Sequence, residues 1–237
     1  MDKALIVIGT RAEAIKIAPV LKAMRGEIEP VVCATGQQPS LVPLAMSAFD
    51  IKPDITLDDK DIDMPLNALL ALLISQIDSA IEDCGPDWVV VVGDSTSSLA
   101  GGVAAFHRRI RLVHIEAGLR TGDMAQPYPE ETNRLLLSKL ATLHFAPTRV
   151  AQQNLVHEGV RPESIVVSGN TIVDAIGQAR MALTRERRIR FDRHLPLDTR
   201  PVVIFTCHRG ETRGEAQIDM CLTLQELCDR YPRHHWI

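Results

Sequence analysis

The stretch DWVVVVGDSTSSLAGGVAAFHRR, residues 87–109, decides the fold. Its four consecutive valines, bounded by Pro86 and Gly93, are typical of a strand that is buried on both faces. The hydroxyl residues that follow suit the N-cap of a helix, and residues 95–109 continue as one. A buried strand that leads directly into a helix is the unit from which parallel α/β sheets are built.

The same unit recurs on both sides of this stretch. Strands are predicted at 4–9, 30–36, 110–118, 143–148 and 164–170, and helices at 12–24, 67–83, 130–141, 149–159 and 171–183. Pro19 is expected to kink or restart the first helix, because proline lacks the backbone donor and clashes with the preceding turn. The alternation of strands and helices predicts an α/β protein with a parallel sheet covered on both faces.

The composition changes near the C-terminal end. Residues 185–200 are polar, basic and contain proline, as is typical of a linker, whereas 201–211 and 217–231 have strand and helix patterns. We therefore expect a first domain at 1–184 and the start of a second, incomplete domain at 201–237. His234 and His235 are expected to be part of a polar surface run.

Bulk properties exclude several classes of protein. The 237 residues are 46% hydrophobic with a net charge of −4, which argues against nucleic acid or an anionic membrane surface as a partner. Five cysteines without a CxxC motif predict neither a disulfide framework nor a zinc ribbon, and favour the cytoplasm. No apolar run is long enough to span a bilayer.

Polar residues gather where the predicted strands end. In open parallel sheets, ligands bind beyond the carboxyl ends of the strands. Those ends carry Gly9-Thr10-Arg11, Gly93-Asp94, Glu116-Ala117-Gly118 and Gly169-Asn170. The residues at this edge are therefore the candidates for function.

Two of these ends allow more than one interpretation. Arg11 and Lys16 flank a helix start whose free N–H groups would suit an anion, although both side chains could simply be solvated. The segment lacks the glycine pattern of a dinucleotide site and the GK[ST] of a P-loop. Asp94 is either the N-cap of the following helix or a carboxylate placed for acid–base chemistry.

The next two ends add further carboxylates. Glu116 has no capping role, so it is either half of a structural salt bridge with Arg120 or a functional acid. Glu130 and Glu131 follow Pro129, in the first turn of a predicted helix, where acidic residues also favour the helix dipole. Arg134 is a second arginine near the same edge.

Histidines offer weaker signals. His208 and Arg209 follow the strand of the second predicted domain, where they are either solvated or bind a diphosphate. His114 is expected either in the core or directly behind the site residues, and His144 is expected to be structural. No His, Cys or Asp set has metal-ligand spacing, so no metal site is predicted. Carboxylates and cations that converge on one edge suit a ligand with hydroxyls and a negative end, such as a nucleotide sugar.

The sequence resembles the non-hydrolysing UDP-N-acetylglucosamine 2-epimerases over nearly its whole length. The stretches that carry the resemblance are GTRAEAIKIAPV, VVVVGDSTSSLAGGVAAFHRRI, HIEAGLRTGDMAQPYPEETNRLLLSKLATLHFAPT, QQNLVHEGV, VVSGNTIVDAI and TCHRGE. The resemblance implies two Rossmann-like domains in the glycosyltransferase-B arrangement with the active site between them. It implies interconversion of UDP-N-acetylglucosamine and UDP-N-acetylmannosamine by loss and return of UDP, without a cofactor or metal. A homodimer and a role in surface polysaccharide biosynthesis are also implied.

The resemblance assigns roles to particular positions. Asp94, Glu116 and Glu130 would be the acid–base carboxylates. His208 would assist departure and return of UDP, with Arg209 beside it. Arg11 and Lys16 would bind substrate in the first domain.

The chain is shorter than members of that family, so we expect a truncated second domain. The alternative to an epimerase is therefore a non-catalytic, epimerase-like domain that binds weakly or associates with an intact homologue. A glycosyltransferase of the same architecture is disfavoured by HIEAGLR and PEETNR.

Overall fold

The computed structural model describes residues 1–58, 64–182, 200–206 and 214–237. The chain divides into two compact units, Met1–Arg180 and Met181–Ile237. His208 and Arg209 lie outside the described residues, as does nearly all of the predicted linker. The domain limits at residues 184 and 201 stay a prediction.

The first unit is built on a seven-stranded parallel sheet, which confirms the predicted fold class. The strand order is β3-β2-β1-β4-β5-β6-β7, and the direction of strand addition reverses between β1 and β4. This doubly wound order places a crevice at the carboxyl ends near the reversal. The strands are β1 Lys3–Ile8, β2 Glu29–Ala34, β3 Ile55–Thr56, β4 Trp88–Val92, β5 Arg111–Ile115, β6 Leu143–Ala146 and β7 Ile165–Val167.

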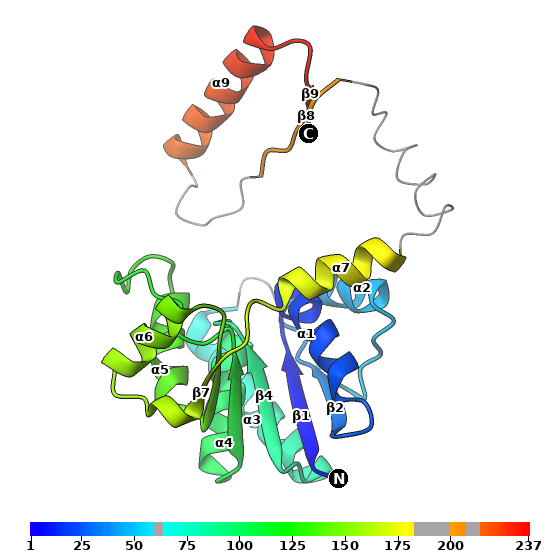
Figure 1. Ribbon diagram of the computed structural model, residues 1–237, viewed down its shortest axis with the longest axis vertical. Helices are drawn as coiled ribbons and strands as arrows, with labels where there is room; N and C mark the ends of the chain where they lie inside the picture. Colours follow the sequence, from blue (N-terminus) through cyan, green and yellow to red (C-terminus); the bar gives the residue numbers. More distant parts are fainter. Residues whose placement is uncertain (59–63, 183–199, 207–213) are drawn as a thin grey trace. The chain divides into compact units, whose positions relative to one another are not determined.

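Helices connect these strands and cover both faces of the sheet (Figure 1). One face packs on α3, α4 and α5, and the other on α1 and α2. A smaller core joins α6 to the β6–β7 edge. The helices are α1 Arg11–Met24, α2 Leu41–Ala48, α3 Leu66–Cys84, α4 Thr96–His107, α5 Glu130–Leu140, α6 Arg149–His157 and α7 Ile172–Ala182, with a 3-10 turn, η1, at Pro162–Ser164.

Alternation along each strand supplies the two cores. In β1, Leu5 and Val7 face α3 and α4, while Ile6 and Ile8 face α1 and α2. All four are fully buried. Successive side chains of a strand point to opposite faces, so an apolar run such as 4–8 has to be covered on both sides. The valine run of β4 is divided between the two cores in the same way.

One expectation needs correction, and two elements were missed. Helix α1 does not restart at Pro19 but continues through it, because Ile17 and Leu21 anchor the helix on the sheet on either side of the proline. The predicted kink stays a prediction. Helix α2 and strand β3 were not predicted at all. Their sequences, eight and two residues long, are too short for a clear period.

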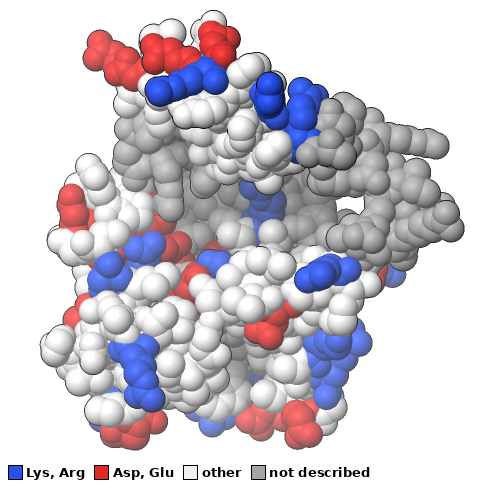
Figure 2. All heavy atoms as spheres, turned by 45° about the horizontal axis from the view of Figure 1, so that its top comes forward, with Lys and Arg blue, Asp and Glu red and all other residues white. Residues whose placement is uncertain are grey.

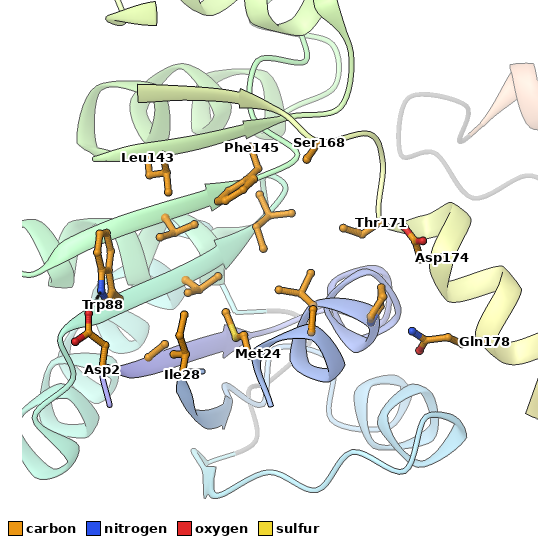
Figure 3. Close-up of a pocket in the computed structure, with 17 residues that line it drawn as sticks. Asp2, Met24, Ile28, Trp88, Leu143, Phe145, Ser168, Thr171, Asp174 and Gln178 are labelled. Carbon is orange, nitrogen blue, oxygen red and sulfur yellow. Dashed lines mark hydrogen bonds between the residues drawn. The ribbon is translucent and has the colours of Figure 1, made fainter. Parts of the chain in front are cut away.

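Part of the sheet face that carries α1 is left open as an apolar hollow of about 640 Å³. Figure 3 shows Leu143 and Phe145 pointing into it from β6, with Met24 and Ile28 opposite. Asp174 and Gln178 of α7 lie at its rim. None of the residues proposed above for function lines this hollow.

The second unit contains a small strand–helix–strand arrangement. Strand β8, Val202–Val203, pairs in parallel with β9, His235–Trp236, and α9, Glu215–Arg230, lies between them in sequence. His235 therefore belongs to a strand and is half-buried. Helix α9 has no buried residue and exposes Ile218 and Leu222.

Charges of both signs are interspersed on the face drawn in Figure 2. Among the described residues, no helix is both long enough and apolar enough to cross a bilayer.

Candidate active site

Three segments that are far apart in sequence meet at Glu116, just beyond the end of β5. Lys16 of α1 places Nζ 2.5 Å from Oε2 of Glu116. Asn170, which follows β7, donates from Nδ2 to Oε1 of the same carboxylate at 2.9 Å. The side chain of Glu116 is 10% exposed, so these two donors replace most of its water. We call Lys16, Glu116 and Asn170 the Glu116 cluster.

The backbone at Glu116 is unusual. Its φ is 65°, in the left-handed region that side chains other than glycine rarely adopt. Such a conformation costs on the order of 1–3 kcal/mol and persists only where the surroundings enforce it. A Cβ added to Gly93 would lie 3.5 Å from Oε2 of Glu116, so the carboxylate packs directly over this glycine at the end of β4.

Asp94, beyond the end of β4, is held by an arginine of α5. Nε and Nη2 of Arg134 lie 2.7 and 2.6 Å from Oδ2 of Asp94. Asn133 of the same helix donates to the backbone carbonyl of Asp94 at 2.8 Å. The carboxylate of Asp94 is 28% exposed and is thus reachable from the crevice.

Glu131 ties Arg134 to the loop before α5. Its Oε2 lies 2.8 Å from Nη1 of Arg134, and its Oε1 accepts from the backbone N–H groups of Thr121 and Gly122. Burial alone would raise the pKa of Glu131, but these donors outweigh it and the pKa is lowered. Burial would likewise lower the pKa of Arg134, but Asp94 and Glu131 reverse that direction. We call Asp94, Glu131, Asn133 and Arg134 the Asp94 cluster.

A buried histidine bridges the two strand ends. His114 of β5 lies two residues before Glu116, and its Nε2 is 2.7 Å from the carbonyl of Gly93, which precedes Asp94. Because a carbonyl only accepts, Nε2 carries the proton and Nδ1 is the bare nitrogen. Burial lowers the pKa of His114 to about 4, so the ring is neutral at pH 7. His144 of β6, its register partner, is also buried, with a pKa lowered by burial to about 4. Both are core residues, as expected.

The start of α1 is not an open anion site. Oε2 of Glu13 accepts from the backbone N–H groups of Gly9 and Thr10, at 2.7 and 2.9 Å, and Thr10 completes a capping box. The backbone N–H of Arg11 donates to Oε1 of Gln38 at 2.9 Å. The backbone N–H groups of Gly9, Thr10, Arg11 and Glu13 are thus already engaged. Burial raises the pKa of the Glu13 carboxyl group.

Two of the sequence-derived candidates remain open to a ligand. Arg11 is exposed at the first turn of α1. Glu130 is half-buried in the first turn of α5, and among the described residues its carboxylate has no hydrogen-bond or ion-pair partner. This edge thus carries a carboxylate and a guanidinium without a partner in the described part of the chain, beside the paired groups.

Two alternatives left open by the sequence are now decided. Asp94 is not the N-cap of α4, because Ser95 occupies that position and accepts from the backbone N–H of Ser98. Arg120 does not pair with Glu116. It forms a bidentate ion pair with Glu158, at 2.7 Å, since Glu116 turns away toward Lys16. His208 and Arg209 lie outside the described residues, so the roles expected for them stay predictions.

Arg134 and Asn170 were expected at this edge of the sheet, but neither was assigned a role there from the sequence. The sequence contains a signal for each of them. Arg134 lies four residues after Glu130, and therefore near the same helix face. Asn170 lies shortly beyond the end of β7 and directly follows a glycine, as Asp94 does beyond the end of β4. Within the described ranges, no group of three or more His, Cys, Asp or Glu residues could hold a metal ion.

Residues 22–237 match the family model of UDP-N-acetylglucosamine 2-epimerase. The chain belongs to this family. A curated family member from Neisseria meningitidis, the UDP-N-acetylglucosamine 2-epimerase, is 36% identical over 241 residues, which is 99% of this chain and 64% of that protein. A probable UDP-N-acetylglucosamine 2-epimerase from Ralstonia solanacearum is 37% identical over 244 residues, 98% of this chain and 64% of its own length.

Solved structures of the epimerase family agree with the fold. The Neisseria meningitidis epimerase bound to UDP-GlcNAc superposes with a TM-score of 0.94 at 36% identity, covering 99% of this chain and 64% of that one. The Methanocaldococcus jannaschii epimerase, in complex with UDP-GlcNAc and UDP, gives 0.86 at 28% identity, covering 100% and 66%. The chain thus spans somewhat less than two thirds of the length of the curated epimerases it matches.

Proposed function

We propose that this chain carries the acid–base half of a UDP-N-acetylglucosamine 2-epimerase, which interconverts UDP-N-acetylglucosamine and UDP-N-acetylmannosamine. The observation that carries the proposal is the pairing of two carboxylates, Asp94 and Glu116, with two cations at adjacent strand ends. Support comes from family membership and from relatives whose structures hold UDP-GlcNAc or UDP.

The reaction needs groups of the kind that gather here. One carboxylate removes the proton from C2 of the sugar while the C1–O bond to UDP breaks. The electron pair of the C1–O bond leaves with UDP, and the pair of the C2–H bond moves between C1 and C2. A C1=C2 double bond forms, giving a 2-acetamidoglucal. UDP then adds back to C1 while a carboxylic acid returns a proton to the other face of C2. The cycle is redox-neutral. It leaves the base protonated and the acid ionised, and proton exchange with solvent restores both groups.

We propose Asp94, Glu116 and Glu130 as the set of acid–base carboxylates, without dividing the two proton transfers among them. General acid–base catalysis contributes about 10²–10⁴-fold to such steps. Glu130 is suited to the set because no described group competes for its oxygens, and Asp94 because it is partly exposed.

Cations have to balance the diphosphate as UDP leaves. We propose that Lys16 and Arg11 bind substrate from α1, and that His208 and Arg209 lie at the diphosphate. Lys16 is already beside a carboxylate, so its ammonium group can stay paired when substrate is absent and turn to the ligand when it binds. No cofactor or metal ion is part of the proposal.

The test is incubation of the chain with UDP-N-acetylglucosamine in deuterated water, followed by proton NMR. The C2 proton signal should disappear while UDP-N-acetylmannosamine signals grow. Glu116→Gln and Asp94→Asn should each slow this exchange by roughly a hundredfold or more. Glu163→Gln and Asp83→Asn are matched controls, because these exposed carboxylates lie away from the carboxyl edge of the sheet.

Two other results are informative. Binding of UDP-N-acetylglucosamine without exchange would favour the alternative, a ligand-binding domain without turnover. Exchange that survives both site variants would contradict the assigned carboxylates. A homodimer is also proposed from the family resemblance, and light scattering after gel filtration tests it by mass.

A further inference from the structure

Asn170 occupies a position that connects the far edge of the sheet to Glu116. It follows Gly169 in the turn after β7, while Glu116 follows β5, and β6 lies between these two strands. Nδ2 of Asn170 is 2.9 Å from Oε1 of Glu116. The side chain of Asn170 is therefore the donor that the edge strand contributes to the proposed active site.

The orientation of this amide is fixed by a second contact. Oδ1 of Asn170 accepts from the backbone N–H of Ile172 at 3.0 Å, at the start of α7. Since the oxygen is held by a backbone donor, the NH₂ group has to face the carboxylate. The contact does not depend on a mobile terminal group, as a lysine contact does, because an asparagine side chain has only two rotatable bonds.

Both oxygens of Glu116 are engaged in this way, Oε2 by Lys16 and Oε1 by Asn170. The two donors differ in what a ligand would do to them. A phosphorylated substrate attracts the ammonium group of Lys16, whereas a neutral amide has no such attraction. Asn170 is then the contact that still holds the Glu116 carboxylate after substrate binds, on a backbone whose φ of 65° needs outside support.

We propose that Asn170 is a positioning residue of the epimerase reaction, which holds Oε1 of Glu116 so that the plane of the carboxylate stays fixed during proton transfer. The proposal rests on the proposed function. We expect replacement of Asn170 to slow the chemical step, because Asn170 acts through Glu116 and is not required to touch the sugar.

The charged groups around Glu116 bear on any pH measurement. Lys16 faces it from α1, and the pair of Asp94 and Arg134 lies at the neighbouring strand end. An added carboxylate at position 170 would face Glu116 directly. Two carboxylates that share a site retain a proton to higher pH than one alone.

The central variant is Asn170→Asp, because it keeps the oxygen that caps Ile172 and removes only the donor to Glu116. We expect kcat to fall roughly ten- to a hundredfold with KM within about threefold of the wild type, the pattern of a lost interaction in the chemical step. The acid limb of the kcat profile should move to higher pH. Asn170→Ala should lower kcat without that movement, since it adds no carboxylate.

Asn154→Asp is the matched control. Nδ2 of Asn154 donates to the carbonyl of Gly118 at 2.9 Å, so the variant also removes a half-buried amide contact, but one without a carboxylate. Its kcat profile should keep the shape of the wild type. If Asn170→Asp and Asn154→Asp change KM and the pH profile alike, Asn170 is merely structural and the proposal is wrong.

A double-mutant cycle on thermal unfolding tests the contact without turnover. The melting temperatures of Asn170→Ala and Glu116→Gln should combine non-additively, by roughly 2–4 °C. The cycle of Asn154→Ala with Glu116→Gln should be additive. Additivity in the first cycle overturns the proposed contact.

The assays separate the two proposals. A wild-type chain that does not epimerise defeats the proposed function, and with it the role of Asn170 in the reaction, even if the coupling is measured. A wild-type chain that epimerises while Asn170→Asp keeps a normal kcat defeats only the role of Asn170.

Discussion

The Glu116 cluster and the Asp94 cluster hold carboxylates at neighbouring strand ends in different ways. Glu116 is bound by two side chains, Lys16 and Asn170, which share no other partner among the described residues. Asp94 is gripped by Arg134, which is also bound to the buried Glu131, and Glu131 is bound to the loop at 121–122. One cluster is a set of independent contacts, and the other is a connected network.

The difference suggests that the Glu116 cluster serves mainly the reaction and that the Asp94 cluster also serves the stability of the fold. A contact that can be released singly suits a group that has to exchange partners with a substrate. A network in which each member holds the next transmits the loss of one member to the others. We therefore expect changes in the Glu116 cluster to alter turnover first, and changes in the Asp94 cluster to alter stability as well.

The largest expected loss of stability comes from Glu131→Ala. This change leaves two backbone N–H groups and Nη1 of Arg134 without their acceptor, in part-buried hydrogen bonds. Breaking such a buried pair costs about 3–5 kcal/mol of the free energy of unfolding. Urea unfolding measures the loss.

The adjacent residue supplies the control for that measurement. Glu130→Ala removes a carboxylate that has no described partner, so its effect on the free energy of unfolding should stay within about 0.5 kcal/mol. Equal losses in the free energy of unfolding for Glu131→Ala and Glu130→Ala would show that Glu131 does not belong to a stabilising network.

The next effect concerns the link between the clusters at His114. The unfolded chain protonates this ring near pH 6.5, whereas the folded chain does so only near its lowered pKa of about 4. Between these values the unfolded state binds more protons, so the free energy of unfolding falls as the pH falls. The fall is about 1.4 kcal/mol per pH unit for one histidine. It is absent above pH 6.5 and complete near pH 4.

Replacement of the histidine isolates this contribution. His114→Gln keeps an amide donor for the carbonyl of Gly93 but cannot titrate. The stability advantage of the wild type over this variant should shrink by about 2–3 kcal/mol between pH 7 and pH 4.5. His144 stays in both proteins and cancels. Parallel pH curves would show that His114 is not buried as a neutral ring.

The smallest expected change in stability is for Glu130→Gln, which keeps the shape of the side chain and removes only its charge. Its melting temperature should differ from that of the wild type by no more than about 2 °C. Its exchange of the C2 proton should nevertheless fall by roughly a hundredfold or more. A variant with normal exchange would remove Glu130 from the proposed set and leave Asp94 and Glu116.

Much of the fold was predictable from the sequence because its core strands are uniformly apolar. The run at 87–92 and the alternating helices permit little other than a covered parallel sheet. The short helix α2 and strand β3 were not predicted, because neither is long enough to show a recognisable hydrophobic period. The continuity of α1 through Pro19 depends on tertiary anchoring by Ile17 and Leu21, which a local rule does not include.

The site was predictable in its location but not in its pairings. Strand ends located Asp94, Glu116 and Asn170, because every parallel strand delivers its end to the same edge. The sequence could not show that Glu116 turns left-handed and pairs with Lys16 instead of Arg120. The residue pattern alone also does not distinguish Glu130, which the family resemblance selects, from Glu131, since adjacent helical residues face about 100° apart and only packing decides which is buried.

The parallel sheet also sets the order in which this site is assembled during synthesis. The two contacts of Glu116 join residues that are 100 and 54 positions apart in the chain. Residues 16 and 116 can meet only after β1, β4 and β5 are paired, and residue 170 has to wait for β7. Contacts of such long range form slowly, because the entropy of closing each loop precedes the gain. We therefore expect the Glu116 cluster to form only after β1 and the strands from β4 to β7 have paired.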